Sequence, residues 1–425
     1  MRSRCFLRAL FIICFTATAL YSSAQPFPVF IGVLNHIASS GQQDQDPEIV
    51  SLMQRAHVGD ATAEYQLGVA YAQGRGVPVD QAQALRWWMQ AAQGGFLRAK
   101  NNLGYAYEHG QGISADLNEA FRWYEEAAAG GLPEAQCNLG FMYERGMGVP
   151  QDYKQAVEWY RKAADGGLAV AQNNLALMYQ KGLGVSQDFD QAVKLLHMAA
   201  EHGDPAALHN LGQTYLTGSG VRRDAHYSAG WFEQAANRGI AESYFALAYM
   251  YERGKGVPRN LEQAASLYRK AAEAGIGKAQ AALGYLYLEG KGVARDESTA
   301  VGWFRKAAEQ GERSGQTGLG YAYYKGIVVR SDYRQSAEWF RKAAEQGDAL
   351  AQGNLGYFCE KGFGVPLDYT EAYKWYELAA AQGNSRAARA KEALVQILTP
   401  KQVAEGRSRV STWSEQHTIA QAFQH

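Results

Sequence analysis

Residue types capable of metal or acid–base chemistry occur in this sequence of 425 residues, but without the spacing that such chemistry requires. His197, His202 and His209 are close enough in the chain to be considered as metal ligands, because imidazole nitrogens bind zinc. There is no H-E-x-x-H segment and no paired C-x-x-C segment, and no nucleophile stands at a recognisable spacing from a base. We therefore expect solvated histidines, no catalytic residue, no metal and no cofactor.

Asparagine and aromatic residues recur at a spacing that suits the binding of another protein. An asparagine amide both donates to and accepts from the backbone of an extended peptide, and tyrosine offers a large contact area at a low entropy cost. Each aromatic position follows an asparagine position by three residues, which on a helix places both on one face. We expect these residues to bind a partner: Asn102, Asn138, Asn174, Asn210, Asn354, Tyr105, Phe141, Tyr249, Tyr285, Tyr321 and Tyr357. The alternative is that the asparagines only join neighbouring turns of the structure.

A repeat of 36 residues sets these positions. Ala-Ala pairs, a valine or isoleucine, and a tyrosine recur at this interval, although Cys359 replaces the tyrosine of the ninth copy. A period of this length is typical of solenoids, in which each unit buries its apolar face against the next. The clearest column is a leucine followed by glycine or alanine: Leu67, Leu103, Leu139, Leu175, Leu211, Leu247, Leu283, Leu319 and Leu355.

Each copy predicts two helices. In the first copy Ala63, Leu67 and Tyr71 form the apolar stripe of a helix A, which Gly74 ends as a left-handed cap. Asp80 is the expected N-cap of helix B, and the equivalent aspartates or asparagine of the other copies are interpreted in the same way, not as catalytic carboxylates. The glycine pairs between the helices resemble a phosphate loop, but they follow a helix and lack the Lys-Ser/Thr of that motif.

Both ends of the array differ from the repeats. Residues 44–59 fit helix B alone and predict a half-repeat, and residues 44–398 form the solenoid. The segment Thr399-Pro400-Lys401-Gln402 predicts an N-cap, a proline in the first turn and a capping-box glutamine. We expect 399–425 to form a capping helix that runs toward Trp413 and covers the open end of the stack, followed by a tail without a strong pattern from Ser414.

The first 24 residues have the features of a cleavable signal peptide. Arg2, Arg4 and Arg8 precede an apolar run that is too short to span a bilayer, and small residues end at Ala24. We expect cleavage after Ala24, a flexible linker over residues 25–43, and a periplasmic or secreted protein without membrane insertion. The balance of 42 basic and 42 acidic residues predicts no nucleic-acid partner. Cys137 and Cys359, the two cysteines left after cleavage, form no disulfide framework.

The unit A-x-x-x-L-G-x-x-Y-x-x-G-x-G-V, followed by D-x-x-x-A-x-x-W-Y-x-x-A-A-x-x-G, resembles the Sel-one-like repeat, a relative of the tetratricopeptide repeat. The resemblance covers residues 44–398, and the copy from Ala135 to Gly167 is close to the family consensus. It implies an all-α, right-handed superhelical solenoid of nine helix–turn–helix repeats whose A helices line a concave groove. Val328 departs from the family pattern, which has glycine at this loop position, and we expect a remodelled loop there.

Family members are mostly adaptors and assembly scaffolds, and the exported bacterial ones are often linked to envelope functions or host contact. The resemblance therefore implies a non-catalytic interaction scaffold in the bacterial envelope or outside the cell, which binds a partner protein or an extended peptide in the concave groove. The alternative is an envelope enzyme or ligand-binding protein that acts on peptidoglycan or β-lactams. The cysteine pairs of some relatives associated with β-lactam binding are missing here. The sequence does not indicate an oligomeric state.

Overall fold

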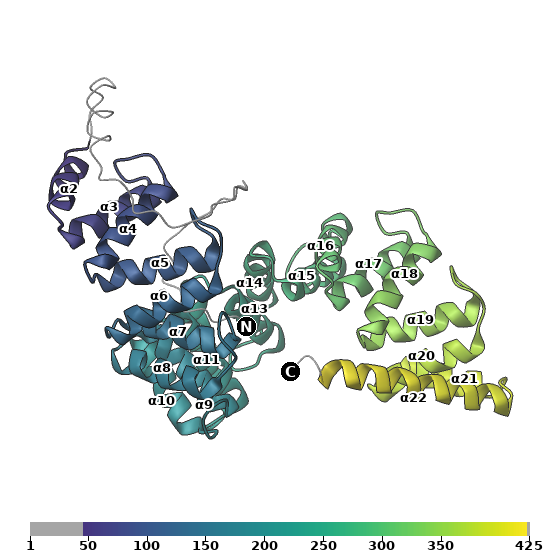
Figure 1. Cartoon of the computed structure of the whole chain (residues 1–425). Helices are drawn as coiled ribbons and strands as arrows, with labels where there is room; N and C mark the ends of the chain where they lie inside the picture. Colours follow the sequence, from purple (N-terminus) through teal and green to yellow (C-terminus); the bar gives the residue numbers. More distant parts are fainter. Residues whose placement is uncertain (1–45, 423–425) are drawn as a thin grey trace. The chain divides into compact units, whose positions relative to one another are not determined.

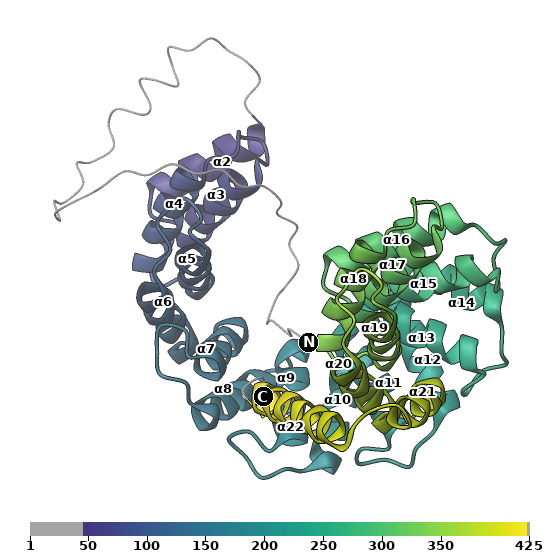
Figure 2. The same cartoon turned by 90° about the vertical axis from the view of Figure 1, so that its right-hand side faces the viewer.

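The computed structural model describes residues 46–422, and their regular structure consists of 21 α-helices, α2 to α22, with no strand among the described residues. The chain divides into two compact units. One contains the residues up to Ala207 together with Ser219–Val221, and the other contains Leu208–Gly218 and the residues from Arg222 onward. Each unit is a succession of helical hairpins (Figures 1 and 2). The predicted signal peptide and linker lie outside the described residues.

Nine hairpins of two 13-residue helices follow one another at intervals of 36 residues, which confirms the predicted all-α solenoid of nine repeats with a C-terminal helix. The A helices are α3 (Ala61–Gln73), α5 (Leu97–His109), α7 (Pro133–Arg145), α9 (Ala169–Lys181), α11 (Pro205–Thr217), α13 (Ala241–Arg253), α15 (Gly277–Glu289), α17 (Arg313–Lys325) and α19 (Ala349–Lys361). The B helices are α4 (Gln81–Gln93), α6 (Leu117–Ala129), α8 (Tyr153–Asp165), α10 (Phe189–Glu201), α12 (Ala225–Asn237), α14 (Leu261–Glu273), α16 (Glu297–Glu309), α18 (Tyr333–Glu345) and α20 (Tyr369–Ala381).

The helix ends are set by the predicted caps. At the start of α8, the Asp152 carboxylate accepts hydrogen bonds from the backbone amides of Lys154 at 2.9 Å and Gln155 at 3.1 Å. At the end of α7, Gly146 adopts φ +65°, a conformation that glycine reaches without a steric penalty. The equivalent N-cap side chains accept a bond in all nine B helices: Asp80, Asp116, Asp188, Asp224, Asn260, Asp296, Asp332 and Asp368 join Asp152.

The core of each repeat depends on close contact between its two helices. In the third copy Tyr160 is fully buried, and its ring packs against Gly140 on the A helix. A Cβ at Gly140 would lie only 2.8 Å from that ring, which explains why a glycine follows the repeated leucine. Ala156 and Ala163 are also fully buried, so small residues let the helices approach while the aromatic ring fills the space between them.

In four repeats a buried glutamine joins the repeat to the preceding one. The side-chain amide of Gln136 on α7 donates to the carbonyl oxygen of Ala128 on α6 at 3.3 Å. Since these groups are buried, a missing partner would leave a polar group without a hydrogen bond at a cost of about 1–3 kcal/mol. The same bond occurs in three further repeats, from Gln172 to Ala164, from Gln280 to Ala272 and from Gln352 to Ala344.

The expectation of a remodelled loop at Val328 is wrong. Val328 has φ +62° and Gly326 has φ +68°, which match the values of +66° at Gly76 and +70° at Gly74 in the first copy. The loop keeps its geometry because the helices on either side keep theirs. The β-branched side chain therefore occupies a left-handed conformation that is unfavourable for any residue with a Cβ.

The N-terminal end of the array is closed by a single helix, α2 (Pro47–His57), which lies within the segment predicted as a half-repeat. Ile49, Leu52 and Ala56 are buried against Leu67 of the first repeat. Asp46 accepts from the Glu48 amide at 2.9 Å and caps this helix.

At the C-terminal end, α21 (Ser385–Val395) packs on α20 and continues the stack, and α22 (Pro400–Ala422) follows. The capping box is confirmed, since the Thr399 backbone amide donates to Gln402 Oε1 at 2.9 Å. The helix continues to Ala422, so the expectation of a tail without structure from Ser414 is wrong for residues 414–422. It folds back on α20, where Val403, Val410 and Trp413 pack against the last core cluster (Figure 1).

Two further findings bear on the sequence-based expectations. Cys359 is a free, buried thiol, so it does not pair with Cys137. Among the described residues, no helix is both long enough and apolar enough to cross a membrane.

Candidate partner-binding face

The five asparagines proposed to contact a partner differ in exposure. Asn174 and Asn210 are 3% and 9% exposed, whereas Asn102, Asn138 and Asn354 are half-buried. The Asn138 amide donates to Asn101 Oδ1 at 3.0 Å, a bond between the A helices of two successive repeats. The Asn174 amide lies 4.0 Å from Cys137 Sγ, also on the preceding A helix. The described contacts of these two amides therefore join neighbouring A helices.

Two of the aromatic residues are well exposed. Tyr249 on α13 and Tyr321 on α17 are 43% and 38% exposed, and both lie in the second unit. Tyr105, Phe141, Tyr285 and Tyr357 are half-buried. Tyr285 packs against Phe304 with ring centres 4.8 Å apart, and its hydroxyl donates to the Ser314 carbonyl oxygen on α17 at 3.2 Å.

Arginine and lysine side chains that follow by one turn of the same A helix lie over several of these rings. The Arg253 guanidinium is 5.6 Å from the centre of the Tyr249 ring, and the Lys361 ammonium is 6.0 Å from that of Tyr357. In the first unit Arg145 is 5.6 Å from Phe141. Such cation–π contacts orient the charged groups beside the rings, so the A helices present aromatic and positively charged groups together.

Leu350 was missed by sequence reasoning, although it belongs to the same helix face. It is 51% exposed on α19 and precedes Asn354 by four residues and Tyr357 by seven. This spacing in the sequence is enough to place Leu350 on the same helix face as Asn354 and Tyr357. Its apolar character departs from the charged or small residues at the equivalent position of the two preceding repeats, Lys278 and Ser314.

An aromatic cluster supports the end of this face in the eighth and ninth repeats. The Tyr333 and Phe363 rings are stacked at 4.8 Å, and Tyr324, Tyr357 and Phe358 join them through ring contacts. Most other repeats have glutamate, glutamine or leucine at the position of Tyr324. Tyr357 is therefore held among other rings and does not stand free on the helix.

The histidines considered as metal ligands are used in packing. His202 Nδ1 lies 3.2 Å from Gln172 Oε1 in the first unit, and His209 Nδ1 lies 2.7 Å from Ser243 Oγ in the second. Burial lowers the pKa of His197 and of His209 below the ordinary value. No group of three or more histidine, cysteine, aspartate or glutamate side chains in the described part of the chain is arranged to hold a metal ion.

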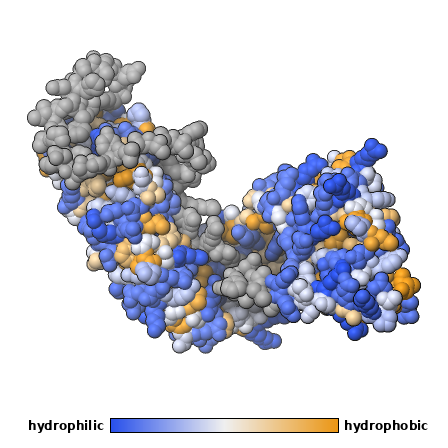
Figure 3. Space-filling model, turned by 45° about the vertical axis from the view of Figure 1, so that its right-hand side comes forward, coloured by the Kyte–Doolittle hydropathy of each residue, from blue (hydrophilic) through white to orange (hydrophobic). Residues whose placement is uncertain are grey.

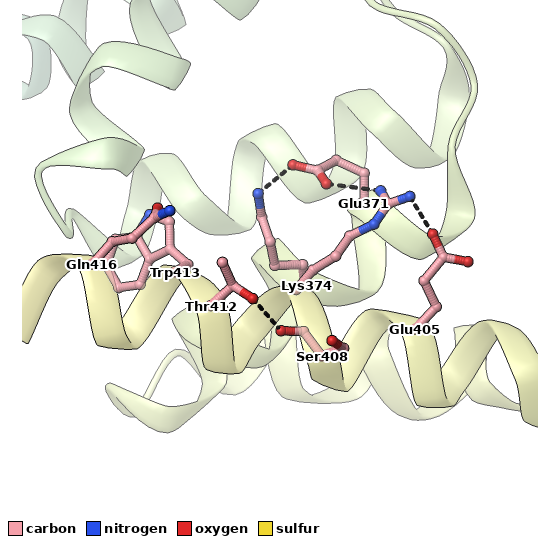
Figure 4. Close-up of a pocket in the computed structure, with 8 residues that line it drawn as sticks. Glu371, Lys374, Glu405, Ser408, Thr412, Trp413 and Gln416 are labelled. Atoms are coloured by element: carbon pink, nitrogen blue, oxygen red, sulfur yellow. Dashed lines mark hydrogen bonds and ion pairs between the residues drawn. The ribbon is translucent and has the colours of Figure 1, made fainter.

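A cavity of about 390 Å³ lies between α20 and α22 (Figure 4). Figure 4 shows its charged wall, in which Lys374, Glu371, Arg409 and Glu405 form a chain of ion pairs. Arg409 is 3.0 Å from Glu371 and 2.6 Å from Glu405. None of the predicted partner-binding residues lines this cavity, and its charged groups hold α22 against α20.

The visible surface in Figure 3 is mostly hydrophilic, with apolar residues in small separate groups. Against this background, the A helices carry exposed aromatic residues. Tyrosine is enriched among the residues that contribute most to protein–protein binding.

Comparison with known proteins extends these observations. The family model described as Sel1 repeat matches residues 61–96, 97–132, 133–168, 169–204, 205–240, 241–276, 277–312, 313–348 and 349–384. A search of curated proteins gave no match.

Two solved structures are similar over most of their own length. One is c5321, described as a protective antigen present in uropathogenic Escherichia coli strains that displays an SLR fold. It is 32% identical, with a TM-score of 0.53, over 87% of this chain and 95% of that one. The other is a Sel1 repeat protein from Oxalobacter formigenes, 34% identical, with a TM-score of 0.54, over 59% of this chain and 99% of that one.

Proposed function

Since the chain belongs to the Sel1 repeat family, we propose that it is a non-catalytic scaffold that binds an extended segment of a partner protein on the solvent-facing side of its A helices. The family fold generally serves protein–protein interaction. The observation that carries the proposal for this chain is the exposure of Tyr249, Tyr321 and Leu350 on three A helices of the second unit. Aromatic side chains are enriched among the residues that contribute most to protein–protein binding.

The proposed contact surface in the second unit combines tyrosine rings, a column of small residues and the basic side chains that lie over the rings. One turn before Tyr249, Tyr285 and Tyr321 stand Ala246, Ala282 and Gly318, which replace the asparagines of the first unit. Tyrosine rings contribute contact area to a partner at a low entropy cost.

We propose that the first unit makes a more polar contact with the partner. Asn102, Asn138, Tyr105 and Phe141 are half-buried there and retain partly accessible atoms. Asn354 has the same exposure in the second unit. The burial of Asn174 and Asn210 assigns these two side chains to the contact between repeats.

Binding can be tested with matched surface variants. The mature chain from Gln25, carrying Tyr249→Ala, Tyr321→Ala and Leu350→Ala, is used as bait beside the unmodified chain in a pull-down from the periplasm of the source cells. The control carries Met198→Ala, Tyr227→Ala and Leu367→Ala, which remove three large apolar side chains of similar exposure from other surfaces. We expect the first variant to lose captured partners by at least about tenfold, which corresponds to about 1.4 kcal/mol, and the control to retain them. Equal capture by both variants contradicts the proposal, provided that circular dichroism shows the same helix content.

The export part of the proposal rests on the first 24 residues of the sequence. Expression with this segment intact is expected to give a periplasmic or secreted product that begins at Gln25, because the apolar run and the small residues ending at Ala24 suit signal peptidase. Mass spectrometry of the fractionated product measures the cleavage site. A cytoplasmic product that retains Met1 contradicts this part.

A further inference from the structure

The A helix of the fifth repeat, α11, buries three polar side chains, one of which is a histidine. His209, Asn210 and Thr214 are all 9% exposed or less. The equivalents of His209 in other repeats include Phe245 and Ala281. Ser243, on α13 of the next repeat, is fully buried at a position where the other repeats have alanine or, once, glycine. Two rare residues therefore occur together at one contact between successive repeats.

These two residues form the polar contact between α11 and α13. His209 Nδ1 lies 2.7 Å from Ser243 Oγ. The imidazole ring centre is 5.3 Å from that of Phe232 on α12, so an aromatic ring covers another side. His209 Nε2 is buried and has no hydrogen-bond partner. In the neutral ring with its proton on Nδ1, the imidazole donates to Ser243 Oγ and leaves only a lone pair at the buried Nε2.

A protonated imidazole does not fit the same place. It carries a positive charge and two N–H donors, of which the one at Nε2 would point into a buried site without an acceptor. Glu242 on α13 is the carboxylate whose charge favours the protonated form, and α12 presents the uncharged Phe232 ring. Burial outweighs Glu242 and lowers the pKa of His209 below its ordinary value of 6.5.

We propose that the His209–Ser243 contact is a pH-sensitive joint, at which acidification separates α11 from α13 while the other repeats keep their packing. In the unfolded or opened state the imidazole takes up a proton near pH 6.5, whereas in the closed state it does so only at lower pH. At a pH between the pKa of His209 in the closed state and its pKa in the open state, opening is accompanied by the binding of a proton. The population of the open state therefore increases as the pH falls. Acidic surroundings would therefore interrupt the stack of A helices at the fifth repeat.

Hydrogen exchange measured by mass spectrometry at pH 7.5 and pH 5.0 tests this joint, after correction for the intrinsic exchange rate. Peptides from α11 are expected to lose protection by about tenfold for each unit by which the two pKa values differ. Peptides from α7 and α17 are expected to change much less. The double variant His209→Phe with Ser243→Ala installs the residues found at Phe245 and at Ala279, and it is expected to abolish the response of α11.

A second variant controls for the loss of any histidine. His226→Gln removes an exposed imidazole whose Nδ1 lies 3.1 Å from the Gly256 carbonyl oxygen, and it is expected to leave the response of α11 intact. An NMR titration of the His209 ring in the unmodified chain should have its midpoint in the same pH range as the loss of protection. Three results overturn the proposal: a response that survives in the double variant, an equal loss of protection in all helices, or protection of α11 that does not change with pH.

Discussion

At the scale of single residues, two columns of the repeat vary together. Four B helices carry a buried tyrosine whose hydroxyl donates to a glutamate on the A helix of the same repeat. The donor–acceptor distances are 2.9 Å for Tyr124–Glu108, 2.7 Å for Tyr160–Glu144, 2.7 Å for Tyr268–Glu252 and 2.8 Å for Tyr376–Glu360. Where phenylalanine replaces the tyrosine, the glutamate is replaced too, as in Phe304 with Leu288. Buried polar groups at this position therefore occur in pairs.

The third repeat allows this pairing to be measured. Tyr160→Phe is expected to lower the free energy of unfolding by about 1–3 kcal/mol, because Glu144 loses a buried donor. The double change Tyr160→Phe with Glu144→Leu copies the Phe304–Leu288 pair and is expected to recover much of the loss. Urea denaturation of the two single variants and the double variant gives the coupling energy. Additive effects of the two changes would contradict the pairing.

Val328 provides a second prediction at this scale. Its left-handed backbone is unfavourable for a β-branched residue, so Val328→Gly is expected to raise the free energy of unfolding by about 1 kcal/mol. Val79 is a suitable control, since the two valines are 58% and 59% exposed but Val79 does not have a positive φ. Val79→Gly is expected to lower stability through the greater freedom of the unfolded chain. Thermal unfolding of both variants tests the difference, and a destabilised Val328→Gly would show that the backbone there is unstrained.

At the scale of helices, the ion pairs of Arg409 and an apolar seam attach α22 to α20. The Arg409 guanidinium is 3.0 Å from Asp368, 3.0 Å from Glu371 and 2.6 Å from Glu405. Trp413 contributes an edge contact to Trp375, with ring centres 6.4 Å apart. Asp368 is also the N-cap of α20, so this carboxylate both caps one helix and binds the other.

Arg409→Ala is therefore expected to loosen α22 by about 1 kcal/mol, a modest amount because the guanidinium is partly exposed and screened by solvent. Exchange of the α22 amides should accelerate while that of α18 stays unchanged. Lys401→Ala removes an exposed positive charge from the same helix and serves as the control. Equal exchange in the two variants would mean that the apolar seam alone holds the helix.

At the scale of the whole molecule, the N-cap carboxylate of Asp296 makes stability depend on pH. The Thr299 amide and hydroxyl, which both bond to Asp296, hold the pKa of this carboxyl below its ordinary value of 3.8. A lowered pKa in the folded chain means that the stabilising effect is complete above about pH 4 and is lost as the pH falls through the folded value. A loss of stability below pH 4 is expected from this cap, and it is distinct from the opening of α11 at milder pH.

Asp296→Asn tests this contribution, because asparagine is itself the cap at Asn260 and does not titrate. The variant is expected to keep most of its stability at neutral pH and to show a shallower decrease of melting temperature between pH 4 and pH 2.5. An unchanged slope would assign acid unfolding to other carboxylates.

Much of the helical architecture was predictable from the sequence, because caps and stripes are local. The Asp152 cap acts on amides two and three residues away, and the Gly146 cap ends the helix it follows. The leucine column and the capping box at Thr399 involve equally short separations. The site was less predictable. Sequence reasoning placed Tyr249 and Tyr321 on an exposed face, but it did not separate them from the buried Asn174.

By itself, the sequence determined the 36-residue period, the two helices of each repeat and most of their caps, since these depend on interactions within one or two turns of a helix. Only the tertiary structure decided which side chains stay exposed, that α22 folds back on α20, that Val328 keeps a left-handed conformation and that His209 meets Ser243, 34 residues away. Such contacts depend on how neighbouring helices stack, and stacking is set by the combined shape of many side chains from different repeats.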